Sequence, residues 1–234
     1  MFRPVPDDLS RSAFADRPFR LLVVPYDKLD ARRYAGRLRI DPRLGHASTM
    51  VIGMDLCPFA GRAWQEQRVR CVQSAASSTL DLLDELQKEL NLLTVSPEIE
   101  TTLLIHPEVL QDFLDFNDFL DSVDALLDAM ELTGVFQVAS FHPDYQFAGE
   151  HEDSVSNYSN RAPYPVLHLL REASVEAAIA AHPNAGQIPA DNISRLETLG
   201  LAGIRERLAG DYQGAGEPQS PLRESSQSPR EGDS

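Results

Sequence analysis

The chain has 234 residues and a net charge of −15, and 42% of its residues are hydrophobic. This length and composition predict one soluble globular domain with a sizeable core, flanked by tails. Residues 1–50 carry 10 Lys and Arg against 6 Asp and Glu, whereas the remainder carries 11 against 30. This acidic remainder of the chain repels phosphate groups, which argues against nucleic acid as the main partner.

Residues 1–49 are expected to form a poorly specified N-terminal extension, and residues 50–212 a single α/β domain. Residues 213–234 are rich in Gly, Pro, Ser, Gln and Glu, which predicts a disordered tail. The two cysteines form neither a disulfide framework nor a CxxC pair, and no run approaches the roughly 18 apolar residues of a membrane span. These features predict a cytoplasmic protein with no membrane partner, and they leave its oligomeric state open.

In the first half of the domain, Pro58 follows Cys57 at the predicted first position of a helix. Residues 68–74 alternate polar and apolar side chains and predict a strand. Ser77 or Ser78 is expected to cap the next helix, because five leucines between residues 82 and 93 recur after it on one helical face. The short apolar run at residues 101–105 predicts a second strand, ended by a proline.

The second half begins with the clearest helix, in which apolar residues from Phe113 to Met130 recur at spacings of three and four. A glycine ends it, and residues 135–141 predict a third strand. Further helices are expected over residues 165–181 and 193–199, and a short amphipathic segment that ends near residue 208 follows the second. Strand–helix–strand–helix–strand order predicts an α/β fold, in which helices flank a small, mainly parallel sheet. A ferredoxin-like α+β sandwich is the alternative.

Two His-Pro pairs follow two of the predicted strands directly. His106 comes after the second strand and His142 after the third. If these strands are parallel, the two histidines emerge at the carboxyl edge of the sheet, where open α/β sheets bind ligands. An antiparallel arrangement would place them at opposite ends.

The polar loop after the third strand is expected to belong to the same site, together with the start of the predicted helix over residues 165–181. Arg161 and Arg171 suit a small anionic ligand, because a guanidinium group binds carboxylate or phosphate through forked hydrogen bonds. The candidate catalytic residues are His106, His142, Asp144, His168 and Cys57. The candidate substrate-binding residues are Tyr145, Asn157, Asn160, Arg161, Tyr164 and Arg171.

A divalent metal is one possible cofactor. His106, His142 and His168 could supply neutral nitrogen ligands, with an oxygen from Asp118 or Asp144. No HExxH or similar close spacing supports this interpretation. The alternative is that the strand-end histidines only bind backbone groups, and without a metal the same residues could serve as general acid or base and anion clamp.

Cys57 offers a different chemistry. A cysteine at a helix N-terminus has a lowered thiol pKa, and Cys-Pro-Phe-Ala resembles the single-cysteine turn of some glutathione-transferase and glutaredoxin-like proteins. The alternative is a buried structural thiol. A third hypothesis is a non-catalytic interaction protein that uses the aspartates of the helix beginning near Phe113.

Several sequence segments resemble those of one bacterial family, the domain of unknown function 1415. They are LCPFA at 56–60, TTLLIHP at 101–107, DFNDFLD at 115–121, FQVASFHPDYQF at 136–147, NYSNRAPYP at 157–165 and LHLLRE at 167–172. The resemblance covers about residues 51–200 and implies a soluble bacterial protein. It implies no activity, substrate or cofactor.

Overall fold

The computed structural model describes residues 51–213 of the chain. The elements in chain order are α2 (Ala60–Gln65), β1 (Val69–Gln73), α3 (Thr79–Val95), β2 (Thr101–Ile105), α4 (Phe113–Ala129), β3 (Phe136–Phe141), η4 (Val155–Ser159), β4 (Val166–Arg171), α5 (Glu172–Ala181), η5 (Ala185–Gln187) and α6 (Ile188–Gln213). The predictions for residues 1–49 and for the tail concern residues outside this range, apart from Gln213, which ends α6. Within the range, no helix has the length and apolar character needed to cross a membrane.

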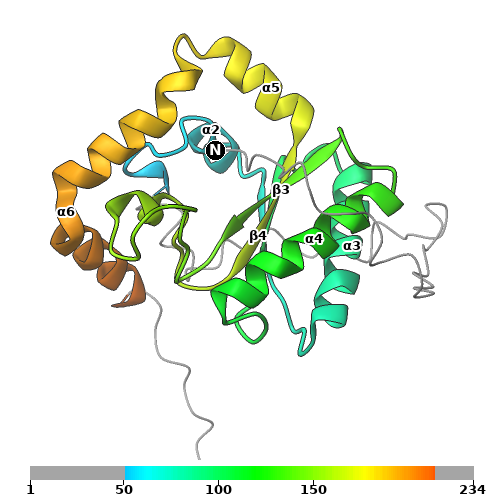
Figure 1. Cartoon of the computed structure of the whole chain (residues 1–234). Helices are drawn as coiled ribbons and strands as arrows, with labels where there is room; N and C mark the ends of the chain where they lie inside the picture. Colours follow the sequence, from blue (N-terminus) through cyan, green and yellow to red (C-terminus); the bar gives the residue numbers. More distant parts are fainter. Residues whose placement is uncertain (1–50, 214–234) are drawn as a thin grey trace, which may run out of the picture.

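The four strands form one mixed sheet in the order β1-β2-β4-β3. β1 and β2 pair in parallel, and β4 pairs antiparallel with both β2 and β3. It follows that β1, β2 and β3 run in one direction and β4 alone runs against them (Figure 1). The predicted α/β class is confirmed. The expected parallel majority holds for strand direction, although two of the three pairings are antiparallel.

The helix predicted over residues 165–181 is wrong in its first part, because β4 occupies Val166–Arg171 and α5 begins only at Glu172. Leu167 and Leu169 are fully buried on one face of β4, while His168 lies on the other. Extended backbone here forms hydrogen-bond ladders with β2 and β3 at once, and this tertiary gain overrides local preference. His168 therefore lies in the middle of a strand.

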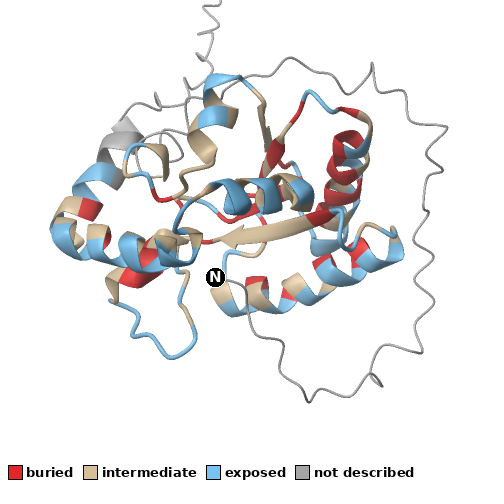
Figure 2. Ribbon diagram, turned by 90° about the horizontal axis from the view of Figure 1, so that it is seen from above, coloured by how far each residue is buried: buried red, intermediate tan, exposed pale blue. Residues whose placement is uncertain are grey.

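One face of the sheet, the closed face, packs against α3 and α4 and forms the main core. Ser78 caps α3 by accepting a hydrogen bond from the Asp81 amide, and Asp112 caps α4 by accepting from the Leu114 amide. The buried residues of α3 include four fully enclosed leucines, whereas α5 has no buried residue (Figure 2). The closed face is thus the more deeply buried side of the sheet.

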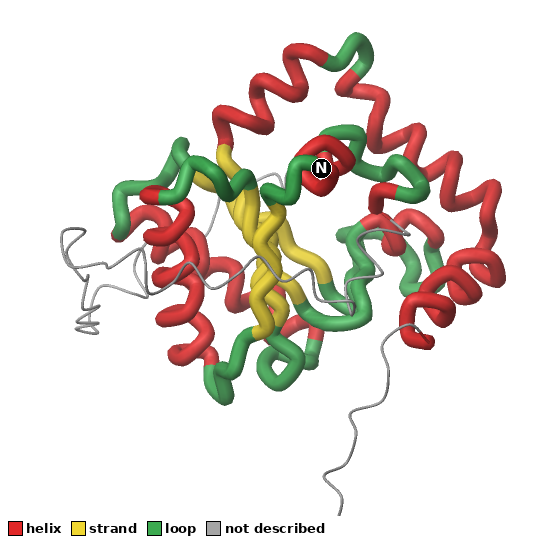
Figure 3. The backbone as a smooth tube through the Cα atoms, turned by 180° about the vertical axis from the view of Figure 1, so that it is seen from behind, coloured by secondary structure: helices red, strands yellow, loops and turns green. Residues whose placement is uncertain are grey.

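The other face of the sheet, the open face, is covered only in part by α2 and α5. Figure 3 shows α3 and α4 on one side of the strands, with α2, α5 and α6 on the other. α6 packs on η4 through Leu196 and Ile204, which contact Leu56 and Tyr158. Gly200 interrupts α6 with a φ of 66°, which glycine adopts at little cost. This second cluster holds the loop before α2 in place beside the sheet.

Candidate functional site

The two strand-end histidines lie together, as predicted. β2 and β3 run in the same direction, so His106 and His142 leave the sheet at the same edge even though β4 lies between them. Both rings pack against Phe116 of α4, each with a centroid distance of 5.4 Å. Both are buried, on the closed-face side.

The hydrogen bonds of these two histidines organise the loop that leads into α4. His106 Nδ1 donates to the Val109 carbonyl at 2.9 Å, and His142 Nε2 donates to the Leu110 carbonyl at 3.2 Å. His142 Nδ1 accepts from the Asp144 amide at 3.0 Å. Leu110 has a φ of 60°, a strained value for a leucine that these contacts help to hold. This geometry matches the alternative interpretation, in which the histidines bind backbone groups.

Burial is the main cause of the lowered pKa values of His106 and His142. Burial, with a smaller contribution from the neighbouring His142, lowers the pKa of His106 to about 4 against the opposing effect of the Val109 carbonyl. Burial also lowers the pKa of His142, against the opposing effect of the Leu110 carbonyl. Both rings are therefore neutral at pH 7. His106 Nε2 is fully enclosed and has no hydrogen-bond partner in the described part of the chain.

The proposed three-histidine metal site is not assembled in this structure. Strand alternation places His168 on the open face, opposite the side where His106 and His142 lie. The side chains of Asp118 and Asp144 are exposed. Within residues 51–213, no group of three or more His, Cys, Asp and Glu side chains is arranged to hold a metal ion.

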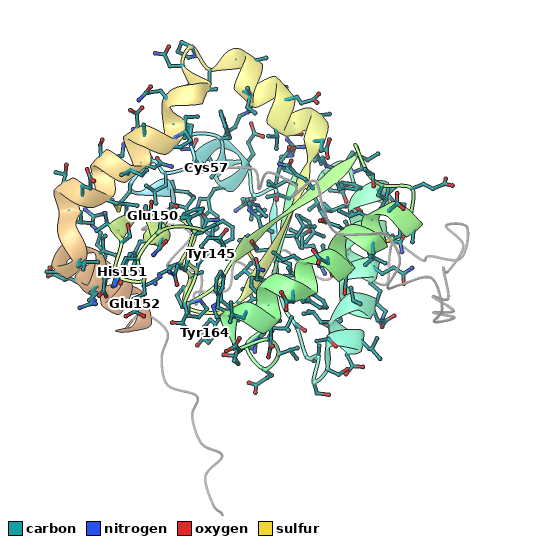
Figure 4. All side chains as sticks on the ribbon, viewed as in Figure 1. Cys57, Tyr145, Glu150, His151, Glu152 and Tyr164 are labelled. Atoms are coloured by element: carbon teal, nitrogen blue, oxygen red, sulfur yellow. The ribbon has the colours of Figure 1, made fainter. Side chains whose placement is uncertain are left out.

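Three of the loop residues predicted to bind substrate make hydrogen bonds that hold the loop together and to the end of β3. Asn157 is fully buried; its Nδ2 donates to the His151 carbonyl and its Oδ1 accepts from the Phe147 amide. Asn160 Nδ2 donates to the Ser140 carbonyl at the end of β3. Arg161 donates to the carbonyls of Tyr145 and Glu152 and lies over the Tyr158 ring. Figure 4 shows Glu150, His151 and Glu152 on the side of this loop toward α6.

Arg171 also has a structural role that the sequence analysis missed. Its guanidinium group donates to the carbonyls of Leu93, Ser96 and Ile99, at 2.7 to 3.2 Å. These carbonyls lie at or just after the end of α3, where backbone acceptors have no helical partner. Arg171 therefore caps α3 and holds it against the sheet.

A cavity of about 970 Å³ lies between the open face, α2 and α5. Its floor comes from alternate residues of the strands, including Leu103, Ile105, Ala139, Phe141, Val166 and His168. Phe59 and Trp64 line it from α2 and the preceding turn, and Ala178 from α5. Four predicted site residues also line it: Cys57, Tyr164, His168 and Arg171. This cavity was not predicted from the sequence, because its apolar strand residues resemble ordinary core positions.

The polar centre of the cavity is a pair formed by His168 and Thr101. Thr101 Oγ1 lies 2.7 Å from His168 Nε2 and 2.5 Å from the Leu169 carbonyl. The Phe141 ring lies 6.1 Å from the imidazole. Burial lowers the pKa of His168 to about 4. The ring is neutral at pH 7, so one of its nitrogens donates a hydrogen bond and the other can accept one.

Cys57 lies at the cavity wall, in the turn before α2 (Figure 4). Burial raises the pKa of its thiol, and this effect exceeds the opposing hydrogen bonds from the amides of Phe59 and Ala60. α2 has only six residues, so its dipole is small. The expected lowering of the thiol pKa is therefore not found, and the thiol is protonated at neutral pH.

Comparison with known proteins places the chain in one family. A family model described as "Protein of unknown function (DUF1415)" matches residues 46–206, and the chain belongs to this family. The matched segment contains all four strands, both strand-end histidines and the residues that line the cavity. No curated protein and no solved structure matches the chain.

Proposed function

We propose that this protein binds a small, neutral and largely apolar organic molecule in the open-face cavity. The observation that carries the proposal is the cavity itself: its volume of about 970 Å³ lies near the upper end of the usual range for ligand pockets. Its lining is mainly apolar and aromatic, with few polar groups, which is the typical composition of such a site.

The partial exposure of the open face supports this proposal. Leu103, Phe141 and Cys71 are only partly buried around the small cluster formed by Ile105, Ala162 and Val166. Removing apolar surface from water contributes about 25 cal/mol per Å², so a ligand that covers this face is stabilised by contact alone.

The charges favour a neutral ligand over the small anion predicted from the sequence. Three arginines contribute to the cavity lining, and each already has partners. Arg62 pairs with Glu66 at 2.8 Å, Arg68 pairs with Glu100 at 2.8 Å, and Arg171 caps α3. Glu66 and Glu100 offset the charges of Arg62 and Arg68, and Arg171 is held by backbone carbonyls, so an anion gains less here than beside unpaired arginines.

Binding is better supported than acid–base or thiol chemistry. The lowered pKa of His168, about 4, makes its imidazole a weak base at neutral pH. The raised pKa of Cys57 keeps its thiol protonated, whereas a nucleophilic cysteine needs the thiolate. Neither Cys57 nor Cys71 forms a disulfide, which is consistent with the proposed cytoplasmic location.

The test uses the neutral fluorescent probe N-phenyl-1-naphthylamine and two matched variants on α5. Ala178 lines the cavity, whereas Ala180 on the same helix is exposed and does not. Ala178→Trp places an indole in the cavity and should weaken saturable binding by about tenfold or more. Ala180→Trp should bind like the unaltered chain. Absence of saturable binding, or equal binding by all three proteins, would overturn the proposal.

A further inference from the structure

Thr101 determines which nitrogen of His168 carries the hydrogen. A hydroxyl group has one hydrogen to donate, and a carbonyl oxygen can only accept. The Thr101 hydroxyl lies 2.5 Å from the Leu169 carbonyl, so its hydrogen must point there. Its oxygen is then an acceptor toward His168 Nε2 at 2.7 Å, which requires the hydrogen of the neutral imidazole to be on Nε2.

In this tautomer, His168 Nδ1 is a hydrogen-bond acceptor. It has no hydrogen-bond partner among residues 51–213, and it is not one of their fully enclosed unpartnered atoms. His168 lines the cavity and keeps part of its surface accessible. Nδ1 therefore offers a lone pair to whatever occupies the cavity.

We propose that Thr101 is a positioning residue that fixes this tautomer, so that the cavity selects neutral ligands carrying a hydroxyl or N–H donor, with aromatic alcohols as the best-fitting class. This inference rests on the proposed binding function and adds the chemical class of the ligand. A carboxylate has only acceptor oxygens, so its lone pairs would oppose the lone pair of Nδ1. Phe59, Trp64, Phe141 and Tyr164 supply aromatic lining for a planar ring.

The experiment compares 2-naphthol with its methyl ether, 2-methoxynaphthalene, by titration of the full chain at pH 7. The two probes share the ring system, but only the naphthol has a donor. One hydrogen bond should make the naphthol bind about five- to tenfold more tightly. Thr101→Ser retains the hydroxyl and should retain this preference.

Thr101→Val removes the hydroxyl with little change in shape. Without its acceptor, the Nε2 hydrogen is buried and unpaired, which favours the tautomer with the hydrogen on Nδ1. That nitrogen can donate to the oxygen of either probe, so the naphthol preference should fall to about one. Nitrogen NMR of the His168 ring should show a hydrogen-free Nδ1 in the unaltered chain and a shift toward the other tautomer in Thr101→Val.

His168→Phe provides a second readout if Thr101→Val does not fold. It should bind both probes with no preference, because the acceptor is gone and the apolar lining remains. Equal affinity of the unaltered chain for the two probes would overturn the donor rule while leaving the binding function intact. Failure of both probes to bind would overturn the binding function as well. A naphthol preference and Nε2–H tautomer that persist in Thr101→Val would overturn the role of Thr101.

Discussion

The two faces of the sheet carry histidines that differ in how far they are buried and in what surrounds them. On the closed-face side, His106 and His142 hold the loop before α4, and the one unpartnered nitrogen, on His106, is sealed inside the protein. On the open face, His168 lines a cavity. Burial lowers the pKa of His106 and His168 alike, to about 4. A lowered pKa therefore does not distinguish a structural histidine from a binding one; the space beside the ring does.

The largest expected difference between the faces is in stability. His142→Ala removes a ring packed on Phe113 and Phe116 and leaves the Leu110 carbonyl without its donor. Urea unfolding should show a loss of about 4 kcal/mol. His168→Ala should cost about 1–2 kcal/mol, because its ring borders open space and Thr101 keeps its bond to Leu169. Equal losses of stability in His142→Ala and His168→Ala would contradict this difference between the faces. His151→Ala is the control, because His151 is exposed.

The pH dependence of stability tests His106 on the closed face, provided that a variant at this residue separates it from His168, whose pKa is lowered to a similar value. The pKa of His106 is about 4 in the folded state and about 6.5 in the unfolded state, so between these values only the unfolded chain binds the proton. Stability should rise as the pH increases from about 4 to about 6.5 and then level off. His106 should account for about 3 kcal/mol of this rise.

The matched variant for this prediction is His106→Asn. The asparagine Nδ2 can replace Nδ1 as donor to the Val109 carbonyl, but it does not titrate. Unfolding at pH 4.5, 5.5 and 7.5 should therefore give a shallower slope for the variant. An unchanged slope would show that His106 does not contribute to it.

Arg171 tests the difference between stabilising the fold and binding a ligand. It caps α3, whereas the sequence suggested that it binds a small anion. Arg171→Met should reduce stability by about 2 kcal/mol, since the carbonyls of Leu93, Ser96 and Ile99 lose their shared donor. Probe affinity in the cavity should change less than stability does. A large loss of affinity without loss of stability would instead identify Arg171 as a binding residue.

The smallest expected effect is on the rate at which the Cys57 thiol is alkylated. It is measured in a Cys71→Ser variant, so that only one thiol can react. Its raised pKa leaves less thiolate at pH 7.5 than a free cysteine has, so iodoacetamide should react more slowly with it. Saturating 2-naphthol should slow the reaction further, because Cys57 lines the cavity. Acceleration by the probe would contradict this arrangement.

The secondary-structure elements that depend on local residue patterns were predicted from the sequence. The apolar stripe of α4 recurs at helical spacing, β1 alternates polar and apolar residues, and β2 and β3 are short apolar runs, so all four elements were identifiable. The convergence of His106 and His142 was also predicted, although it arises from a shared strand direction rather than from adjacent strands.

What depends on distant partners was not predictable. β4 is a strand because β2 and β3 flank it, and no local signal within residues 166–171 reports those neighbours. Arg171 appeared suited to an anion, yet its acceptors lie more than seventy residues earlier in the chain. Thr101 carries no distinguishing sequence pattern, since its importance comes from lying beside His168 on the next strand.

The central position of β4 has a consequence for how the chain folds. β2 and β3 cannot complete their hydrogen bonding until residues 166–171 have inserted between them. A chain growing from its N-terminus therefore exposes two unsatisfied strand edges until the last strand arrives, and such edges can pair with other chains. Synthesis, rather than the finished fold, is the stage at which this protein is most vulnerable to aggregation.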